Sequence, residues 1–342
     1  MSGAQPSRFP PPAVSVVIAA YTMRRWDDLR AAVASVRTQV VPVLRTVVVI
    51  DHHPELLAIA RAEFDDVTVV PNAGRPGASA TRNTGVAYCQ SEVVAFLDDD
   101  AIATPTWLAA LLRHFSRPEV VGAGGRLDPR WDTGRPRWFP PEFDWAVGTS
   151  YRGMPANAEP VRNVWTNGMA IRRSAFDRVA GFRTDFGKVG ERSRPEDTDL
   201  CLRAAAAHAD GAWIYDPAAV VLHRVPAGRA TLRYFLRRCF NEGSGKAALA
   251  VLNGLGKSTR VERAYVRQVL FQGIRSGLRA AFHRDVPNAT RGLAIVAGLV
   301  LTATGFLSGR SMLLVRDARR AGIWLFRDRP ALLEGEGHAY SR

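Results

Sequence analysis

Three consecutive aspartates, Asp98-Asp99-Asp100, stand at the end of the apolar run EVVAFLD. Ionised carboxylates this close together repel one another unless a cation lies among them. Oxygen ligands suit a hard divalent ion such as Mg²⁺ or Mn²⁺, and the phosphates of a substrate complete its coordination. The triplet therefore indicates a metal site, with a solvated acidic turn as the alternative.

A glycine-containing loop, NAGRPGASATRNTG, forms the second candidate at residues 72–85. Gly74 and Gly77 loosen this loop, and Arg82 lies one turn inside the helix that is predicted to follow. A helix N-terminus with an arginine nearby favours a phosphate group. An ordinary connection between a strand and a helix is the alternative.

The acidic segment RPEDTDLCLR, residues 194–203, is the third candidate. Glu196 can complete a capping box with Ser193, and Asp199 can pair with Arg203 on the next helical turn. Asp197 is left without such a structural role. A carboxylate at the start of a helix that faces a cleft could act as a general base.

A single histidine, His223, ends the apolar run Val220–His223 and precedes a segment rich in glycine and arginine. A lone histidine is more often structural than functional. Its position at a strand end favours a functional role, because ligands of open α/β sheets lie at the carboxyl ends of the strands.

The first 125 residues alternate apolar runs with helical patterns, which predicts an α/β fold. Strands are expected at Ala13–Ala20, Arg45–Asp51, Val67–Pro71 and Glu92–Asp98, and helices at Trp26–Arg37, Glu55–Phe64, Ala78–Cys89 and Pro105–Phe115. Nearly continuous apolar strands indicate a parallel sheet that is covered on both faces. Asp51 and the aspartate triplet then stand at the edge of the sheet where ligands bind.

The regular alternation stops after Gly125. Residues 126–165 are rich in proline, glycine and aromatic side chains, and they are predicted to form a long, partly ordered excursion over one face. The remaining expected elements are helices at Ser174–Val179, residues 193–208 and Thr231–Val251, and a short strand at Val220–His223.

Together these segments resemble the family 2 glycosyltransferases of the GT-A fold. The matching segments are VSVVIAAY, VVVID, NAGRPGASATRNTG, FLDDD, WTNGMAIRR, RPEDTDLCLR and HRVPAGRATLRYFLRRCFNEGSGKA. Their order and spacing fit over residues 13–250. The resemblance implies a catalytic domain with a Rossmann-like, mostly parallel sheet and helices on both of its faces.

The resemblance also implies a donor, a nucleotide-diphosphate sugar, and residues that bind it. Asp51 would recognise the base, and Asp98 would face the ribose or the sugar. The nucleotide-sugar residues are Ala20, Tyr21, Asp51, Arg75, Arg82, Asp98 and Asp99, and the floor of the donor-sugar and acceptor site is Trp165, Thr166, Asn167 and Gly168.

The implied chemistry is inverting, metal-assisted sugar transfer to the hydroxyl of a saccharide or a lipid-linked acceptor. Asp100 and His223 would hold Mn²⁺ or Mg²⁺ on the diphosphate. Asp197 would be the general base, with Glu196 beside it on the acceptor side.

Two other functions stay open. A sugar-1-phosphate nucleotidyltransferase shares the sheet and the metal chemistry, but it would show a glycine-rich basic loop where AAYTMRRW follows the first strand. A membrane-associated scaffold with a vestigial nucleotide pocket is the non-catalytic alternative, and the retained Asp98, Asp100, Asp197 and His223 speak against it.

Composition and charge separate the two ends of the 342-residue chain. Residues 1–223 hold 25 basic and 25 acidic side chains, whereas residues 224–342 hold 21 basic and 7 acidic ones, so the second segment carries the whole net charge of +14. Three widely spaced cysteines fit a reducing compartment. Residues 1–12 lack the pattern of a secretion signal, and we expect a disordered lead-in and a cytoplasmic start.

The segment 255–342 is expected to be helical. A capping-box pattern, Thr259-x-x-Glu262, opens an arginine-rich amphipathic helix, and the charge-free stretch Gly292–Leu307 follows. Sixteen residues fall short of the roughly 20 that cross a bilayer. Two interpretations stay open, a peripheral position on an anionic membrane at the inner face of the cell and packing against the catalytic domain. No nucleic-acid partner is expected, since no binding module accompanies the basic region.

Overall fold

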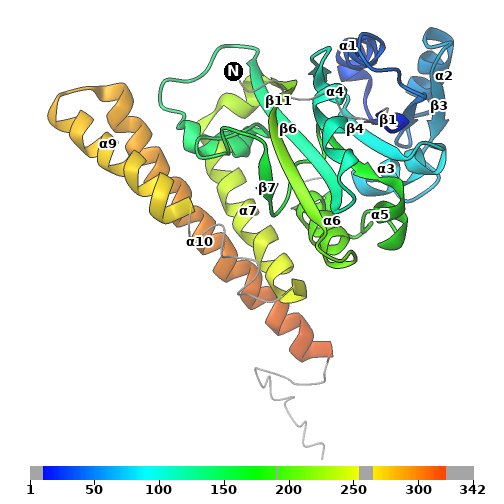
Figure 1. Ribbon diagram of the computed structural model, residues 1–342. Coiled ribbons are helices and arrows are strands. Elements are labelled where there is room, and N and C mark those ends of the chain that lie inside the picture. Colours follow the sequence, from blue (N-terminus) through cyan, green and yellow to red (C-terminus); the bar gives the residue numbers. More distant parts are fainter. Residues whose placement is uncertain (1–10, 190–191, 254–264, 321–342) are drawn as a thin grey trace, which may run out of the picture.

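The computed structural model describes residues 11–189, 192–253 and 265–320 (Figure 1). Its strands are β1 Val14–Ala20, β2 Arg45–Ile50, β3 Thr68–Pro71, β4 Val93–Asp98, β5 Ala101–Ala103, β6 Val120–Trp131, β7 Glu159–Val161, β8 Met169–Arg172, β9 Gly187–Val189, β10 Arg192–Arg194 and β11 Ala212–Val225. Its α-helices are α1 Trp26–Arg37, α2 Pro54–Glu63, α3 Ala78–Ala87, α4 Trp107–Leu112, α5 Arg173–Arg178, α6 Glu196–Ala206, α7 Leu232–Asn253, α9 Phe271–Phe282 and α10 Val286–Arg320. Short helical segments are η1 Met23–Arg25, η2 Arg113–Ser116, η3 Pro141–Val147, η4 Ala227–Ala230 and η5 Val266–Leu270.

The central sheet has the strand order β3-β2-β1-β4-β8-β6-β11-β5, with β7 paired to β11. β3, β2, β1, β4, β6 and β11 run in one direction, and β8, β5 and β7 run against them. β9 and β10 form a separate hairpin. The predicted mostly parallel α/β sheet is therefore confirmed.

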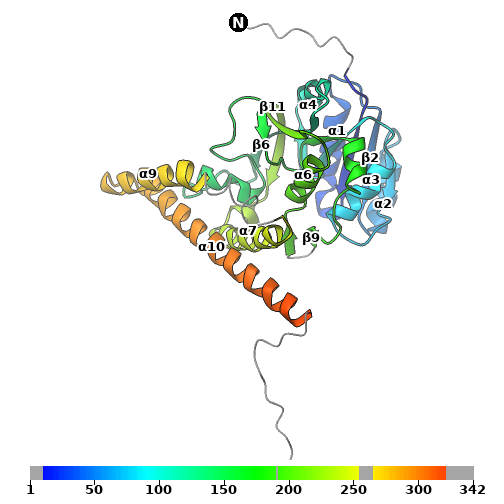
Figure 2. The same cartoon turned by 60° about the horizontal axis from the view of Figure 1, so that its bottom comes forward.

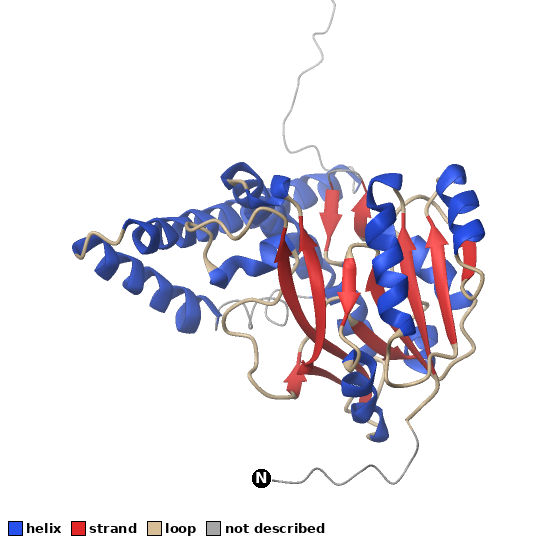
Figure 3. Cartoon of the chain, turned by 90° about the horizontal axis from the view of Figure 1, so that it is seen from above, coloured by secondary structure: helices blue, strands red, loops and turns tan. Residues whose placement is uncertain are grey.

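Helices cover both faces of this sheet, as the apolar strands predicted (Figure 3). Alternate residues of a strand point to opposite faces, so in β1 Val16 and Ile18 join one core while Val17 joins the other. The first core takes side chains from α1, α2 and α4, and the second from α3, α5 and α6. The predicted helices of the first 125 residues are present, with ends that differ by a few residues.

The structure corrects the prediction of a long, partly ordered excursion at residues 126–165 in two respects. Residues 126–131 complete the long strand β6, which pairs with β8 and β11 inside the sheet. Phe139 and Phe143 are buried in a third hydrophobic core together with Phe235 of α7 and Ile295 of α10. The aromatic side chains are needed because this core joins the sheet domain to the C-terminal helices.

Two local boundaries also differ from the prediction. The expected capping box before α6 does not form, because Ser193 lies in β10 and Pro195 occupies the N-cap without a side-chain hydrogen bond. The expected short strand at Val220–His223 is the end of the 14-residue β11. The second capping-box pattern, at Thr259 and Glu262, lies outside the described residues.

The C-terminal helices form a hairpin of α9 and α10 that projects from the sheet domain, with α7 packed along α10 (Figures 1 and 2). Gly243 and Gly305 allow the two backbones to approach closely. A Cβ on Gly243 would lie 2.0 Å from the Thr302 carbonyl oxygen, and one on Gly305 would lie 2.0 Å from that of Phe240. The C-terminal helices are thus tied to the helix that follows the sheet.

Candidate active site

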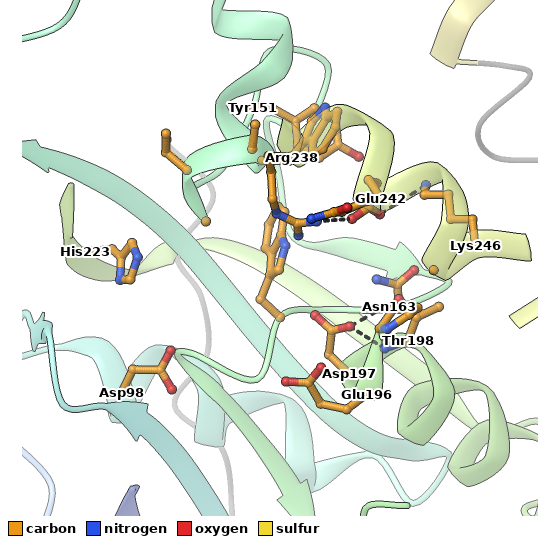
Figure 4. A pocket seen from close by; sticks show the side chains of 18 of the residues that line it. Asp98, Tyr151, Asn163, Glu196, Asp197, Thr198, His223, Arg238, Glu242 and Lys246 are labelled. Atoms are coloured by element: carbon orange, nitrogen blue, oxygen red, sulfur yellow. Dashed lines mark hydrogen bonds and ion pairs between the residues drawn. The ribbon is translucent and has the colours of Figure 1, made fainter. Parts of the chain in front are cut away.

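A cavity of about 1130 Å³ opens at the carboxyl ends of the parallel strands. It brings together residues that are far apart in the chain. Predicted site residues that line it are Ala20, Tyr21, Asp51, Arg82, Asp98, Asp99, Asp100, Trp165, Glu196, Asp197 and His223. Figure 4 shows His223 and Asp98 on one side of the cavity and side chains of α7 on the other, with Glu196 and Asp197 of α6 also within it.

The aspartate triplet follows β4 and turns into β5, and two arginines neutralise part of its charge. Arg25 of η1 donates to Asp99 Oδ1 at 2.7 Å and lies 3.0 Å from Asp100 Oδ2. Arg82 of α3 donates to Asp98 Oδ1 at 2.8 Å. Burial alone would raise the pKa of Asp98, but the charge and hydrogen bond of Arg82, together with His223 and Arg25, outweigh it and hold that pKa below its usual range.

Asp99 retains an unsatisfied oxygen. Burial, together with the charge of Asp100, raises the pKa of Asp99 to about 7 despite the opposing Arg25. Among the described residues its Oδ2 is buried and has no hydrogen-bond partner. A surplus of carboxylate oxygen at this point is what a divalent cation relieves.

His223 lies on β11 opposite Ala101 of β5, which places it beside the triplet. Its Nδ1 is 3.4 Å from Asp100 Oδ1 and 3.1 Å from Asn167 Nδ2, and its Nε2 is 3.1 Å from Arg229 Nη1. Burial lowers the pKa of His223. The imidazole is therefore held neutral, which is the form that binds metals.

Asp51 stands directly after β2 and is fixed by its surroundings. Asn72 Nδ2 donates to its Oδ1 at 2.7 Å, the Gly77 amide donates to its Oδ2 at 2.8 Å, and His52 Nδ1 lies 2.9 Å from Oδ1. Burial would raise the pKa of Asp51, but these hydrogen bonds outweigh it and lower that pKa. The Asp51 carboxylate is thus ionised, and it can accept hydrogen bonds from a ligand at this end of the cavity.

Asp197 is the second residue of α6 and faces the middle of the cavity. The Thr198 amide donates to its Oδ1 at 2.6 Å. Burial, and then the neighbouring charge of Glu196, raises the pKa of Asp197 to about 7. Arg82 links this helix to the triplet, since it also donates to Glu196 Oε1 at 3.2 Å.

Four predicted site residues do not line the cavity. Arg75 is exposed on the loop after β3. Thr166, Asn167 and Gly168 are packed behind the wall, where Asn167 Oδ1 accepts from the Asp98 amide at 3.2 Å. This segment supports the triplet and His223 from behind, while Trp165 reaches the cavity itself.

Sequence reasoning missed several residues of the cavity. Arg25 and Arg229 contact the triplet and His223, and a row of polar side chains on α7 forms the opposite wall. The row follows the helical spacing of Arg238, Glu242 and Lys246 (Figure 4). That spacing was visible in the sequence, but the face it would present to a ligand was not.

No group of three or more His, Cys, Asp or Glu side chains arranged to hold a metal is found in the described part of the chain. Asp100 and His223 nevertheless lie together, with a surplus carboxylate oxygen next to them. Two protein ligands fit an ion such as Mn²⁺ or Mg²⁺ that keeps further positions for substrate phosphates and water.

Comparison with known proteins decides the family. The glucosyl-dolichyl phosphate glucuronosyltransferase of Haloferax volcanii is 31% identical over 244 residues, which is 70% of this chain and 78% of that protein. The chain belongs to glycosyltransferase family 2. The family model described as glycosyl transferase family 2 matches residues 15–180 of this glycosyltransferase, from β1 through α5.

Two further proteins are similar to this family 2 glycosyltransferase. The succinoglycan biosynthesis protein ExoM of Rhizobium meliloti is 25% identical and covers 58% of this chain and 70% of its own length. The solved structure of a mannosyltransferase from Pyrobaculum calidifontis, in complex with GDP-mannose and Mn²⁺, aligns with a TM-score of 0.53 at 17% identity. The alignment covers 93% of this chain and 86% of that one, and it supports the GT-A fold.

One described helix of this glycosyltransferase passes a length and composition test for a membrane span. The segment Val286–Met312 of α10 is 27 residues long, and an 18-residue stretch within it has a mean hydropathy of 1.8 and is 33% buried. The helix extends beyond the sixteen-residue charge-free stretch on which the sequence prediction rested.

Proposed function

We propose that the protein transfers a sugar from a nucleoside-diphosphate sugar to an acceptor hydroxyl, with inversion at the anomeric carbon. The observation that carries the proposal is the meeting of Asp51, Asp100, Asp197 and His223 on one cavity. They come from β2, the β4–β5 turn, α6 and β11, and only folding brings them together.

The donor binds at the strand ends in this proposal. Asp51 accepts hydrogen bonds from the base, next to Ala20 and Tyr21. Arg82 is buried between Asp98 and Glu196, so it keeps both carboxylates in place at the boundary between donor and acceptor.

Asp100 and His223 would hold Mn²⁺ or Mg²⁺ against the diphosphate. When bound, the metal supplies Lewis acidity that stabilises negative charge on the leaving group. The structural relative that binds GDP-mannose with Mn²⁺ supports this assignment. The protein's own contribution is the placement of a neutral imidazole beside an aspartate at the end of the sheet.

The acceptor enters from the α6 side, where Asp197 takes the proton of its hydroxyl. A pKa near 7 suits a general base that works at neutral pH. The Trp165 ring offers an apolar face for a sugar, and Tyr151 packs edge-on against that ring at 5.9 Å between centroids.

Release of the nucleoside diphosphate tests the proposal directly. Purified protein is incubated with a panel of UDP- and GDP-sugars and Mn²⁺, and the liberated UDP or GDP is measured with and without saccharide acceptors. Metal-dependent release from at least one donor is expected. Failure with every donor, when UDP and GDP also fail to bind, would leave the non-catalytic scaffold as the better account.

We further propose that α9 and α10 lie on an anionic membrane surface. The side of α10 that faces α7 and the third core is buried, while Leu293, Val296, Val300 and Leu307 are exposed at helical spacing. A spanning position would draw the charged α7 into lipid, since α7 packs along α10. Arginines of α9 flank its exposed Phe271, Leu278 and Phe282 and would meet lipid phosphates.

Flotation with vesicles tests this surface. The double substitution Leu278→Ser and Phe282→Ser is expected to reduce binding to phosphatidylglycerol vesicles severalfold, because it removes exposed apolar area. Val40→Ser, at an exposed position in the loop that follows α1, is the matched control and should bind as the wild type does. Equal flotation of all three proteins would refute the surface.

A further inference from the structure

The wall of the cavity opposite the triplet is built by α7, which has no role in the donor site described above. Six of its polar residues line the cavity, namely Tyr234, Arg237, Arg238, Asn241, Glu242 and Lys246. They recur on adjacent turns of one helical face. Three are cationic and one is anionic, so this wall favours a negatively charged ligand.

The charged side chains on this wall hold one another in place. Arg238 Nη1 donates to Glu242 Oε2 at 3.0 Å, and Lys246 Nζ lies 3.7 Å from Glu242 Oε1. The guanidinium of Arg238 also lies over the Trp145 ring, 6.0 Å from its centroid. Figure 4 shows the three charged side chains as a connected row along the cavity. A carboxylate that holds two cations side by side prepares them for a third group with several acceptor oxygens.

The charged row on α7 lies close enough to Asp197, the proposed base, for their charges to interact. The charge of Asp197 acts on Arg238, and that of Glu242 acts on Asp197. Asp197 and the α7 residues also line the same cavity, so an acceptor whose hydroxyl is at Asp197 can reach α7 with its other end. Asp98 and His223, beside which the donor diphosphate is proposed to bind, lie on the opposite side of the cavity (Figure 4).

An apolar surface continues from the same wall. Leu249 of α7, Val266 and Val269 of η5, and Leu299 of α10 line this part of the cavity. Close to Leu299 on α10, Val296 and Val300 are exposed. A ligand that is anionic at Arg238 and Lys246 can thus extend along hydrocarbon-like surface toward the outer face of α10.

We propose that α7 binds the phosphate of the acceptor, and that the acceptor is a saccharide joined through phosphate to a long hydrocarbon chain such as a polyprenyl chain. Arg238 and Lys246 hold the phosphate, and the chain leaves along Leu249, Val266 and Leu299. The inference rests on the proposed function, because it assigns the far end of a molecule whose near end meets Asp197. A soluble acidic saccharide would use the cations but not the apolar surface.

Binding of simple probes separates this inference from sugar transfer. Full-length protein, loaded with UDP or GDP and Mn²⁺, is titrated with farnesyl phosphate, farnesol and inorganic phosphate below the micellar range, and binding is followed by calorimetry. Farnesyl phosphate should bind at least about tenfold more tightly than either of the others, since only it engages both surfaces. Equal affinity for farnesol would overturn the phosphate site, and equal affinity for inorganic phosphate would overturn the hydrocarbon path.

Two variants and a control locate the site. Lys246→Gln and Arg238→Gln should each weaken farnesyl phosphate about tenfold or more, because each removes a charged hydrogen bond. Arg233→Gln, an exposed arginine of α7 that does not line the cavity, should bind as the wild type does. If Arg238→Gln does not fold, the variant Lys246→Gln still tests the site. An equal loss in Arg233→Gln, or a matching loss of nucleoside-diphosphate affinity in Lys246→Gln, would refute the assignment, whereas absence of sugar release alone would count against the proposed function.

Discussion

The two sides of the cavity are built from different secondary-structure elements. The donor side consists of strand ends, where each carboxylate of the triplet is held by an arginine or lies against His223. The proposed acceptor side consists of helices, with α7, η5 and α10 packed on the aromatic third core. The comparison shows that short strand-end segments position the proposed donor site, whereas the proposed acceptor site depends on how whole helices pack.

The residue where the two sides meet should be the most sensitive. Asp197→Asn removes the proposed base but keeps the shape of the side chain, so kcat should fall on the order of 10²–10⁴-fold. Nucleoside-diphosphate affinity should change little, because the donor side is intact. Steady-state kinetics and calorimetry check both points, and a variant with near-normal turnover would refute the assignment of Asp197.

The acceptor side should depend on the third core. Phe235→Ala removes a fully buried ring that contacts Phe139 and Phe143, and it should lower the free energy of unfolding by about 3–5 kcal/mol. Phe240→Ala, at a partly exposed position of the same helix, is the control and should cost far less. Denaturant unfolding measures both, and equal effects would contradict the role given to the core.

The donor side should respond to loss of the proposed metal ligand. Asp100→Asn should weaken Mn²⁺-supported binding of UDP or GDP by at least about 10–100-fold, the range seen even for residues that only support metal ligands. Asp65→Asn, exposed after α2, is the control. Calorimetry with and without Mn²⁺ distinguishes the proteins. Binding that needs no metal in the wild type would remove Asp100 and His223 from this role.

The smallest effect expected is a shift in the pH profile. Asp197 works as a base only when ionised, so kcat/KM should fall about tenfold per unit as the pH drops below about 7. Glu196→Gln should move the midpoint to lower pH, because the charge of Glu196 helps to raise the pKa of Asp197. An unchanged midpoint would show that another group titrates.

Asp197 should also make the free energy of unfolding depend on pH, and this dependence should have the opposite sign to that of kcat/KM. The pKa of Asp197 is raised in the folded protein from 3.8 to about 7, so the fold binds this proton more tightly than the unfolded chain does. Its contribution to stability is therefore present at low pH and is lost as the pH rises from about 4 to 7.

Much of the donor side could be predicted before the structure was seen. Alternating apolar strands and helices specified a two-faced sheet, and a sheet of that kind places Asp51 and the triplet at one edge. The order of local motifs was enough because consecutive elements pair with near neighbours. The positions of Arg75 and of the segment Thr166–Gly168 were harder to predict. A residue's place in the sequence does not say whether its side chain faces the cavity or lies behind the cavity wall.

The amino-acid sequence by itself determined β1 to β4, the helices between them and the carboxylates at the strand ends, because these follow from short-range hydrophobic periodicity. Only tertiary structure decided what the aromatic segment and the C-terminal helices do. Phe139, Phe235 and Ile295 are separated by long stretches of chain, and their contact in the third core depends on how whole helices pack. That packing turns α7 toward Asp197 and so creates the acceptor wall, which no local pattern could have shown.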